Sequence, residues 1–172
     1  MHPMRPVHRT DKYIDLAEWL CFDCRNPELA LEWVDRALHA EPENPEALTL
    51  KGDILQEAGR CEEAVASYDR ALEIVPDALE AIAERARALH TLERWEDALA
   101  AAETGLAVLD EFTGGEAEPD PVLAMLHEIR ISSLIGLGQR SAAQAAAREA
   151  LERCPGDERL LELAALSSIS RR

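Results

Sequence analysis

The chain has 172 residues, of which 47% are hydrophobic and only 4% are aromatic. Its 18 lysines and arginines stand against 34 aspartates and glutamates, which gives a formal charge of −16. This balance argues against nucleic-acid binding, because phosphate contacts need clustered cations, and it favours a partner with a basic segment. No apolar run approaches the roughly 20 residues of a membrane helix, and the N-terminus lacks the apolar stretch of a secretory signal, so we expect a cytoplasmic protein.

Small residues and prolines recur along the chain at a spacing of 34 residues. Ala30, Ala64 and Ala98 are 34 residues apart, as are Pro42 and Pro76. A fixed period of this size predicts a solenoid of helix pairs rather than one globular core. Such an array is expected to present a surface that holds another protein.

The first residues are predicted to be a tail followed by the first helix pair. Residues 1–10 carry Arg5, Arg9 and two histidines, so we interpret this segment as a basic N-terminal tail. One hypothesis is that the tail occupies an acidic groove of the protein, and the alternative is a disordered terminus. The first repeat is predicted at 11–44, with a second helix that opens at Asn26-Pro27.

The repeat at 45–78 has the clearest helix boundaries. Asn44 can cap a helix whose first residue is Pro45, where the missing N–H removes no helical hydrogen bond. Gly59 offers a left-handed stop for that helix, and Pro76 is expected to end the helix that follows.

Small residues in the same repeat predict close helix packing. Gly52 and Ala64 are small where two helices are expected to cross, and Tyr68 is the large side chain that would fill the space they leave. Ala71 would leave room for the first helix of the next repeat. Helical spacing of three and four residues places each set on one stripe.

The C-terminal half is predicted to contain two more repeats and a cap. The third repeat spans 79–112 and has Asp110 where a proline would end the helix, so its second helix is expected to run on by a turn. Glycines and prolines mark 113–123 as a loop insertion. The fourth repeat spans 124–157, and 158–172 are predicted to form a capping helix that covers the last apolar face, with a short tail.

These residues resemble the tetratricopeptide-repeat family. In the repeat at 45–78 the family pattern falls on Leu48, Lys51, Gly52 and Leu55 of the first helix and on Ala64, Tyr68, Ala71 and Pro76 around the second. The resemblance covers residues 11–157 and implies an all-α, right-handed α-solenoid of about four helix pairs. Because the family typically binds peptides or helices in the groove lined by first helices, the resemblance implies a protein-binding scaffold or adaptor.

The resemblance also places the residues that would line this groove. They come from the first helices and the turns that follow them, and they are Asp15, Trp19, Phe22, Asp23, Thr49, Asp53, Gln56, Glu57, Arg87, His90 and Glu128. Trp19 and Phe22 would anchor an apolar side chain of the partner, or else pack under the N-terminal segment or against the second helix. The carboxylates would attract a basic peptide, or else form an ordinary solvated face.

One subset of the family grips the C-terminal carboxylate of chaperones with a clamp of lysine and asparagine. This clamp is missing, since Glu80 and Glu84 stand at its Lys and Arg places in the third repeat. A carboxylate ligand would meet like charge there, so we exclude that ligand class.

Cysteines and histidines give little support for chemistry. The four cysteines are too few and too scattered for a disulfide framework. Cys21 and Cys24 form a lone C-x-x-C, half of a zinc site, so a metal or redox sensor stays an alternative, as does a small secretion-type chaperone. His90 and His127 are expected on the surface or in the groove rather than as general bases.

No phosphate-binding loop or nucleophile–base pattern is present in the sequence. The main prediction is therefore a non-enzymatic scaffold with no catalytic residue, no metal and no cofactor. Whether the chain forms a homodimer through its apolar groove residues is left open.

Overall fold

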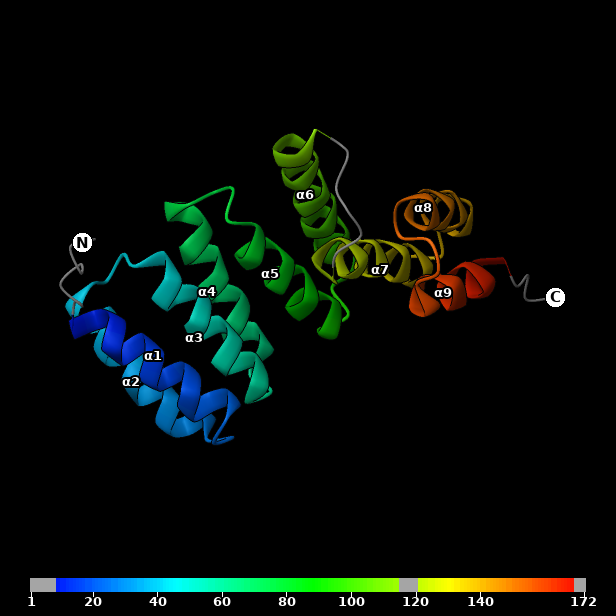
Figure 1. Cartoon of the computed structure of the whole chain (residues 1–172). Helices are drawn as coiled ribbons and strands as arrows, with labels where there is room; N and C mark the ends of the chain where they lie inside the picture. The colour runs from blue at the N-terminus through cyan, green and yellow to red at the C-terminus, as the bar shows by residue number, and fades with distance from the viewer. Residues whose placement is uncertain (1–8, 115–120, 169–172) are drawn as a thin grey trace. The chain divides into compact units, whose positions relative to one another are not determined.

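The computed structural model describes residues 9–114 and 121–168 (Figure 1). In chain order the helices of these residues are α1 (Arg9–Phe22), α2 (Pro27–Ala40), α3 (Pro45–Glu57), α4 (Cys61–Ile74), α5 (Leu79–Thr91), α6 (Trp95–Thr113), α7 (Pro121–Gly136), α8 (Arg140–Arg153) and α9 (Glu158–Ser168). The described residues contain no strand, which confirms the predicted all-α fold class. None of the described helices has the length and apolar character needed to cross a bilayer.

The chain divides into two compact units, 1–81 and 82–172, and the division falls within α5. The first unit contains α1 to α4 and the first turn of α5. The second unit contains the rest of α5 and α6 to α9. Each unit has its own packing and is described separately below.

Asparagine–proline pairs start α2 and α3. The Asn44 side-chain oxygen accepts a hydrogen bond from the backbone N–H of Ala47 at 2.9 Å, and Pro45 follows at the first helical position. Asn26 caps α2 in the same way, through the N–H of Leu29 at 3.2 Å. Each cap satisfies one of the N–H groups that have no partner inside the helix, so both predicted helix starts are confirmed.

The turns inside successive hairpins need a residue with a left-handed backbone. Gly59, at φ +74°, ends the turn region after α3 as predicted, and Gly138 does the same after α7 at φ +72°. Arg25 and Glu93 lie 34 residues before and after Gly59 and also have positive φ, 51° and 56°. An L-residue other than glycine pays roughly 1–2 kcal/mol in this conformation, so these two turns are strained where glycine is absent.

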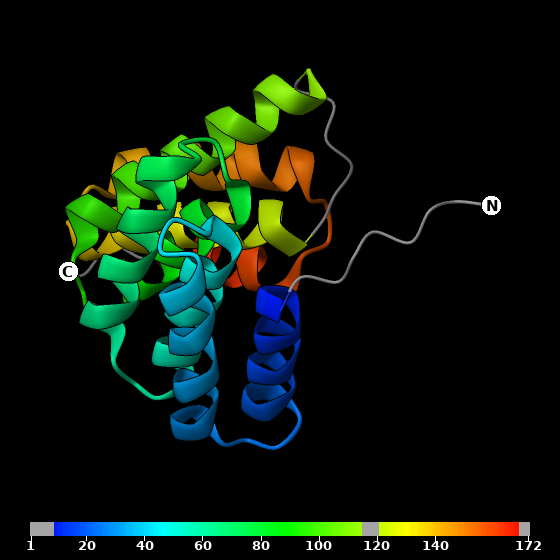
Figure 2. The same ribbon diagram turned by 90° about the vertical axis from the view of Figure 1, so that its left-hand side faces the viewer.

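The first unit consists of antiparallel hairpins packed side by side, of which α1 and α2 are seen most clearly in Figure 2. Gly52 of α3 faces the ring of Tyr68 on α4, and a Cβ at position 52 would lie only 2.3 Å from that ring. Tyr68 is fully buried, and its hydroxyl donates a hydrogen bond to Asp53 at 2.7 Å. The prediction that Tyr68 fills the space left by small residues is confirmed.

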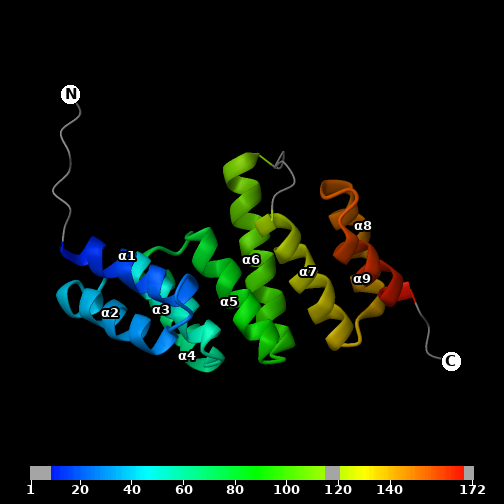
Figure 3. The same ribbon diagram turned by 60° about the horizontal axis from the view of Figure 1, so that its bottom comes forward.

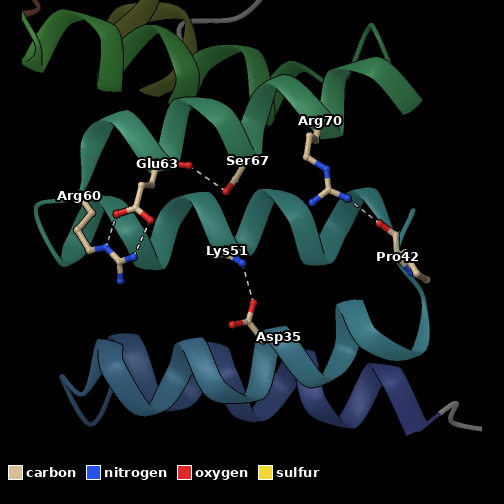
Figure 4. Close-up of polar contacts among 7 residues, drawn as sticks. All are labelled: Asp35, Pro42, Lys51, Arg60, Glu63, Ser67 and Arg70. Atoms are coloured by element: carbon tan, nitrogen blue, oxygen red, sulfur yellow. Dashed lines mark hydrogen bonds and ion pairs between the residues drawn. The ribbon is translucent and has the colours of Figure 1, made fainter.

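Small residues also mediate contacts between successive hairpins. Ala71 of α4 packs in a buried cluster with Leu48 of α3 and Ala81 of α5. This confirms that Ala71 leaves room for the next helix. A polar contact joins the first two hairpins, since Lys51 of α3 donates to Asp35 of α2 at 2.7 Å (Figure 4).

The second unit is built around α6, α7 and α8, with α9 at its end. α6 has 19 residues against 14 in α4, which confirms the predicted extension of this helix. A Cβ on Gly105 of α6 would lie 2.9 Å from Leu126 of α7, so glycine permits this close approach. α9 packs on α8 and α7 (Figure 3), as expected of a cap. Leu160 and Leu163 of α9 are buried.

Two predicted boundaries fall inside helices of the structure. α1 starts at Arg9, and Thr10 is buried with its hydroxyl donating to Glu41 at 2.6 Å. At the predicted insertion 113–123, Thr113 is the last residue of α6 and Pro121 is the first residue of α7. The hypothesis that the N-terminal tail occupies a groove falls on residues 1–8, outside the described part of the chain.

Candidate functional site

An exposed stripe runs along α1 in the first unit. Asp15, Trp19 and Phe22 are spaced by four and three residues, which places them on one helix face. Trp19 is 53% exposed and Phe22 is 47% exposed. Neither ring is therefore buried against the second helix, which was one of two alternatives for this pair, and the other, packing under the N-terminal segment, falls largely on residues 1–8, outside the described part of the chain. We call these three residues the α1 stripe.

The C-terminal ends of α1 and α3 share a cleft of about 400 Å³. Its walls are Cys21, Phe22, Arg25, Pro27 and Glu57. The cleft brings together Phe22 and Glu57, which were both predicted to line the groove. Arg25 was missed, although its spacing of 34 residues from Gly59 could have placed it in the turn at this end of the hairpin. The cleft therefore contains a cation as well as the predicted acid.

The environment of Cys21 opposes a redox or metal role. Its side chain is buried, and burial raises the pKa of the Cys21 thiol, with further increases from the carboxylates of Glu57 and Asp53. Reactive and metal-binding cysteines need the opposite, a lowered pKa that favours the thiolate. Within the described residues no three potential metal ligands come together.

The predicted residues of α3 differ in how free their polar groups are. Asp53 is half-buried and accepts the hydroxyl hydrogen of Tyr68. The Thr49 hydroxyl donates to the carbonyl of Pro45 in its own helix at 2.9 Å. Gln56 is also half-buried, whereas Glu57 is exposed. Glu57 is therefore the residue of this set best placed to meet a ligand.

The predicted site residues of the second unit make contacts within that unit. Arg87 forms an ion pair with Glu84. His90 meets the edge of the Trp95 ring with centroids 5.2 Å apart, and burial lowers the pKa of His90. These contacts occupy both side chains within the fold.

Two predicted site residues remain, Glu128 in the second unit and Asp23 in the first. Glu128 of α7 accepts a hydrogen bond from Arg159 of α9 at 2.9 Å. Asp23 is exposed in the turn after α1, where its N–H bonds to the carbonyl of Trp19 at 3.1 Å. Asp23 therefore follows the α1 stripe directly, with an exposed side chain.

His127 was expected on the surface or in the groove, and this expectation is wrong. The side chain is fully buried on α7, and neither ring nitrogen has a hydrogen-bond partner among the described residues. Burial, followed by the positive charge of Arg153, lowers the pKa of His127 to about 4. A buried histidine of this kind cannot be recognised from helical spacing alone, because the identity of its neighbours depends on how α6, α7 and α8 pack.

Comparisons with known proteins agree with the observed fold. A family model described as a tetratricopeptide repeat matches residues 23–78 and, in a second overlapping match, residues 49–115. MamA from Desulfovibrio magneticus RS-1 is 19% identical with a TM-score of 0.79, over 94% of this chain and 85% of that one. PilW, a type IV pilus biogenesis factor, is 20% identical with a TM-score of 0.76, over 90% of this chain and 66% of that one.

A third similar structure is a chain of the Cut9–Hcn1 hetero-tetramer of APC/C. It is 16% identical with a TM-score of 0.75, and the match covers 94% of this chain and 30% of that one. At such identities the likeness shows the fold alone. A search of curated protein sequences gave no match.

Proposed function

Because the chain belongs to the tetratricopeptide-repeat family, we propose that it is a protein-interaction scaffold that binds a basic peptide or helix at the α1 stripe. The family fold is that of a protein–protein interaction scaffold and is generally non-enzymatic. The proposal adds the chemistry of the ligand, which would have apolar side chains next to lysine or arginine. It adds no catalytic role and no cofactor.

The observation that supports this function most is the exposure of two aromatic rings beside carboxylates. Large exposed aromatic side chains are costly in water and are typical anchors in interfaces. Trp19 and Phe22 would be covered by apolar side chains of the ligand. Asp15 and Asp23 lie next to them and would favour the cationic groups of the ligand.

The cleft beside Phe22 sets the polarity of the site at the C-terminal end of α1. Glu57 would pair with a cation, whereas Arg25 would repel one and could accept a carboxylate or carbonyl of the ligand. The ligand is therefore expected to place a basic residue over Asp15 and to have a mixed or neutral end at the cleft, where Asp23 and Glu57 are balanced in part by Arg25.

We also propose the cytoplasm as its location. All four cysteines are free thiols in the structure, and three of them are buried. Free cysteines are typical of reducing compartments, in which structural disulfides rarely form. Support for this location would come from fractionation of the native cell.

Binding to peptide arrays tests the ligand chemistry. The array would present peptides with alternating apolar and basic residues, together with versions in which glutamate replaces every basic residue. Wild-type protein should select the basic set, and Trp19→Ala/Phe22→Ala should weaken binding by about tenfold or more, because truncating an interface anchor costs upwards of about 1 kcal/mol.

Charge reversal tests the role of the carboxylates with a matched control. Asp15→Lys/Glu57→Lys should weaken the binding of basic peptides. The control variant Glu62→Lys/Glu73→Lys should bind them as wild type does, although both variants change the net charge equally at exposed residues. Asp53 is left intact because its carboxylate accepts the Tyr68 hydroxyl.

Two results would end the proposal. One is equal binding of basic and acidic peptides by wild-type protein whose helical circular dichroism is intact. The other is a dimer that becomes a monomer in Trp19→Ala/Phe22→Ala during sedimentation, because the α1 stripe would then be a homodimer interface rather than a peptide site.

A further inference from the structure

A second cleft, also of about 400 Å³, lies on the α1–α2 hairpin of the first unit. Its walls are Arg9 and Tyr13 of α1 and Glu32, Asp35, Arg36, His39 and Ala40 of α2. We call it the outer cleft. At 3.6 residues per turn, Arg9 lies about 80° and Tyr13 about 120° around the helix axis from Trp19, the nearest residue of the α1 stripe. Both also precede the stripe along α1, so the outer cleft lies on a different face of this helix from the candidate peptide site.

Two arginines in the outer cleft lie on aromatic rings. The Arg36 guanidinium carbon is 4.3 Å from the centre of the Trp33 ring, and that of Arg9 is 5.9 Å from the centre of the Tyr13 ring. The two rings are themselves in contact, with centroids 5.6 Å apart at an angle of 46°. The four side chains thus contact one another in series across the hairpin, in the order Arg9, Tyr13, Trp33 and Arg36.

These arginines differ from several other arginines among the described residues. Arg60, Arg94 and Arg153, for example, form ion pairs with carboxylates at 2.5–2.7 Å. Within the described residues, Arg9 and Arg36 have no ion-pair partner and are exposed. A stacked guanidinium keeps its N–H donors free in the plane of the group, oriented for a carboxylate.

The charge that remains in the outer cleft is positive. The carboxylate of Asp35 accepts a 2.7 Å hydrogen bond from Lys51, which offsets its charge (Figure 4). Glu32 is left to oppose Arg9 and Arg36, and His39 adds a further donor. The partial positive charge of the α1 N-terminus, which starts at Arg9, adds to this potential.

From this geometry we propose that the outer cleft binds an acidic peptide segment of a second partner protein. Carboxylates of the segment receive hydrogen bonds from Arg9 and Arg36, and an apolar side chain of the segment packs on Tyr13 and Ala40. The chain's own residues 1–8 do not match this chemistry, because they carry a basic residue and histidines but no carboxylate. The scaffold therefore has two sites of opposite charge preference on one hairpin.

Salt decides whether an acidic peptide can approach a protein of charge −16. At about 0.15 M salt the Debye length is about 8 Å, so most carboxylates elsewhere on the protein are screened. Hydrogen-bonded pairs at contact distance are screened much less. The binding experiment should therefore use physiological salt rather than low salt.

Indole N–H signals in NMR spectra of the full chain can locate binding, because the chain has three tryptophans in three different places. Trp33 reports on the outer cleft, Trp19 on the α1 stripe and Trp95 on the second unit. The probe is a capped peptide of alternating glutamate and leucine at up to about 1 mM, the range of weak complexes. We expect the Trp33 signal to shift, while Trp19 and Trp95 stay in place.

Substitutions then test the two arginines. Arg9→Gln/Arg36→Gln should lower the affinity for the acidic peptide by about tenfold or more, since hydrogen bonds to charged groups are strong. Lys12→Gln removes an exposed charge from the same helix outside the stack and should change the affinity by less than about twofold. Glu32→Gln should strengthen binding by removing the opposing carboxylate.

Several outcomes would overturn the proposal, provided that circular dichroism shows folded variants. One is a peptide-induced shift centred on the Trp19 indole signal, and another is no shift of any indole signal with the peptide. A third is an equal loss of peptide affinity in Arg9→Gln/Arg36→Gln and in Lys12→Gln. A shift of Trp33 with a single-stranded DNA oligonucleotide but not with the peptide would also refute it. These outcomes do not depend on Trp19 binding a basic peptide, so this test and that of the proposed function can fail separately.

Discussion

Replacement of His127 by leucine should remove a pH-dependent loss of stability. The imidazole is fully buried between α6, α7 and α8. Its charged neighbours are Arg130 on its own helix, Arg153 and Glu149 on α8, and Asp110 on α6. Burial and the two arginines disfavour the imidazolium, and the two carboxylates compensate only in part. The folded protein therefore holds His127 neutral, with a pKa of about 4.

The size of the effect follows from the difference between the folded and unfolded pKa values. The pKa of His127 falls from 6.5 to about 4 on folding, and each pKa unit corresponds to about 1.4 kcal/mol. The unfolded chain binds the proton more tightly, so the contribution to stability is complete above pH 6.5 and is lost as the pH falls toward 4. The total loss is about 3 kcal/mol, of which about 2 kcal/mol is lost by pH 5.

Urea unfolding of both proteins at about pH 7.5 and pH 5 would measure this loss. Carboxylates also titrate over part of this range, but they do so in wild type and in His127→Leu alike, so the difference between the two proteins isolates the imidazole. Between these two pH values, the free energy of unfolding of wild type should fall by about 2 kcal/mol more than that of His127→Leu. His39→Gln, at an exposed position of α2, is the control and should behave as wild type. Parallel losses in wild type and His127→Leu would refute the reasoning.

Three further substitutions test the packing and the turns by thermal or urea unfolding. Gly52→Ala gains about 1 kcal/mol of helix propensity, but its Cβ would lie 2.3 Å from the Tyr68 ring, and overpacking costs about 1–3 kcal/mol. The net loss of stability is therefore up to about 2 kcal/mol, and a higher unfolding midpoint than wild type would contradict this contact. Tyr68→Phe leaves the Asp53 carboxylate without its 2.7 Å donor and should cost about 1–2 kcal/mol, whereas no loss would mean that water replaces the hydroxyl fully. Glu93→Gly relieves a φ of +56° and should stabilise by about 0.5–1 kcal/mol, whereas Glu93→Ala, which keeps the strained backbone, should not.

Local chemistry made the helices of this protein predictable. Asn44 and Pro45 favour a helix start at their position, because cap and ring geometry act within a few residues. The spacing of Gly52 and Tyr68 likewise predicted a close crossing, since a large ring needs a small residue opposite. Strain at Arg25 was missed because nothing in the residue type signals a left-handed backbone.

The candidate site was predictable only in part. The spacing of Asp15, Trp19 and Phe22 indicates one helix face from the sequence, because the period of an α-helix is fixed. Their exposure could not be predicted, since it depends on whether another element covers that face. Asp53 and Glu57 are equivalent in the sequence pattern, yet one holds the Tyr68 hydroxyl and the other faces solvent.

The sequence by itself determined the all-α class, the helix starts at Asn26 and Asn44, and the small residues at the crossings, because backbone capping and helical period are short-range properties. Only the tertiary structure decided that His127 is buried without a hydrogen bond and that Arg36 lies on Trp33. Both depend on which side chains of separate helices come within contact distance. That distance is set by how whole hairpins pack against one another, which no local pattern specifies.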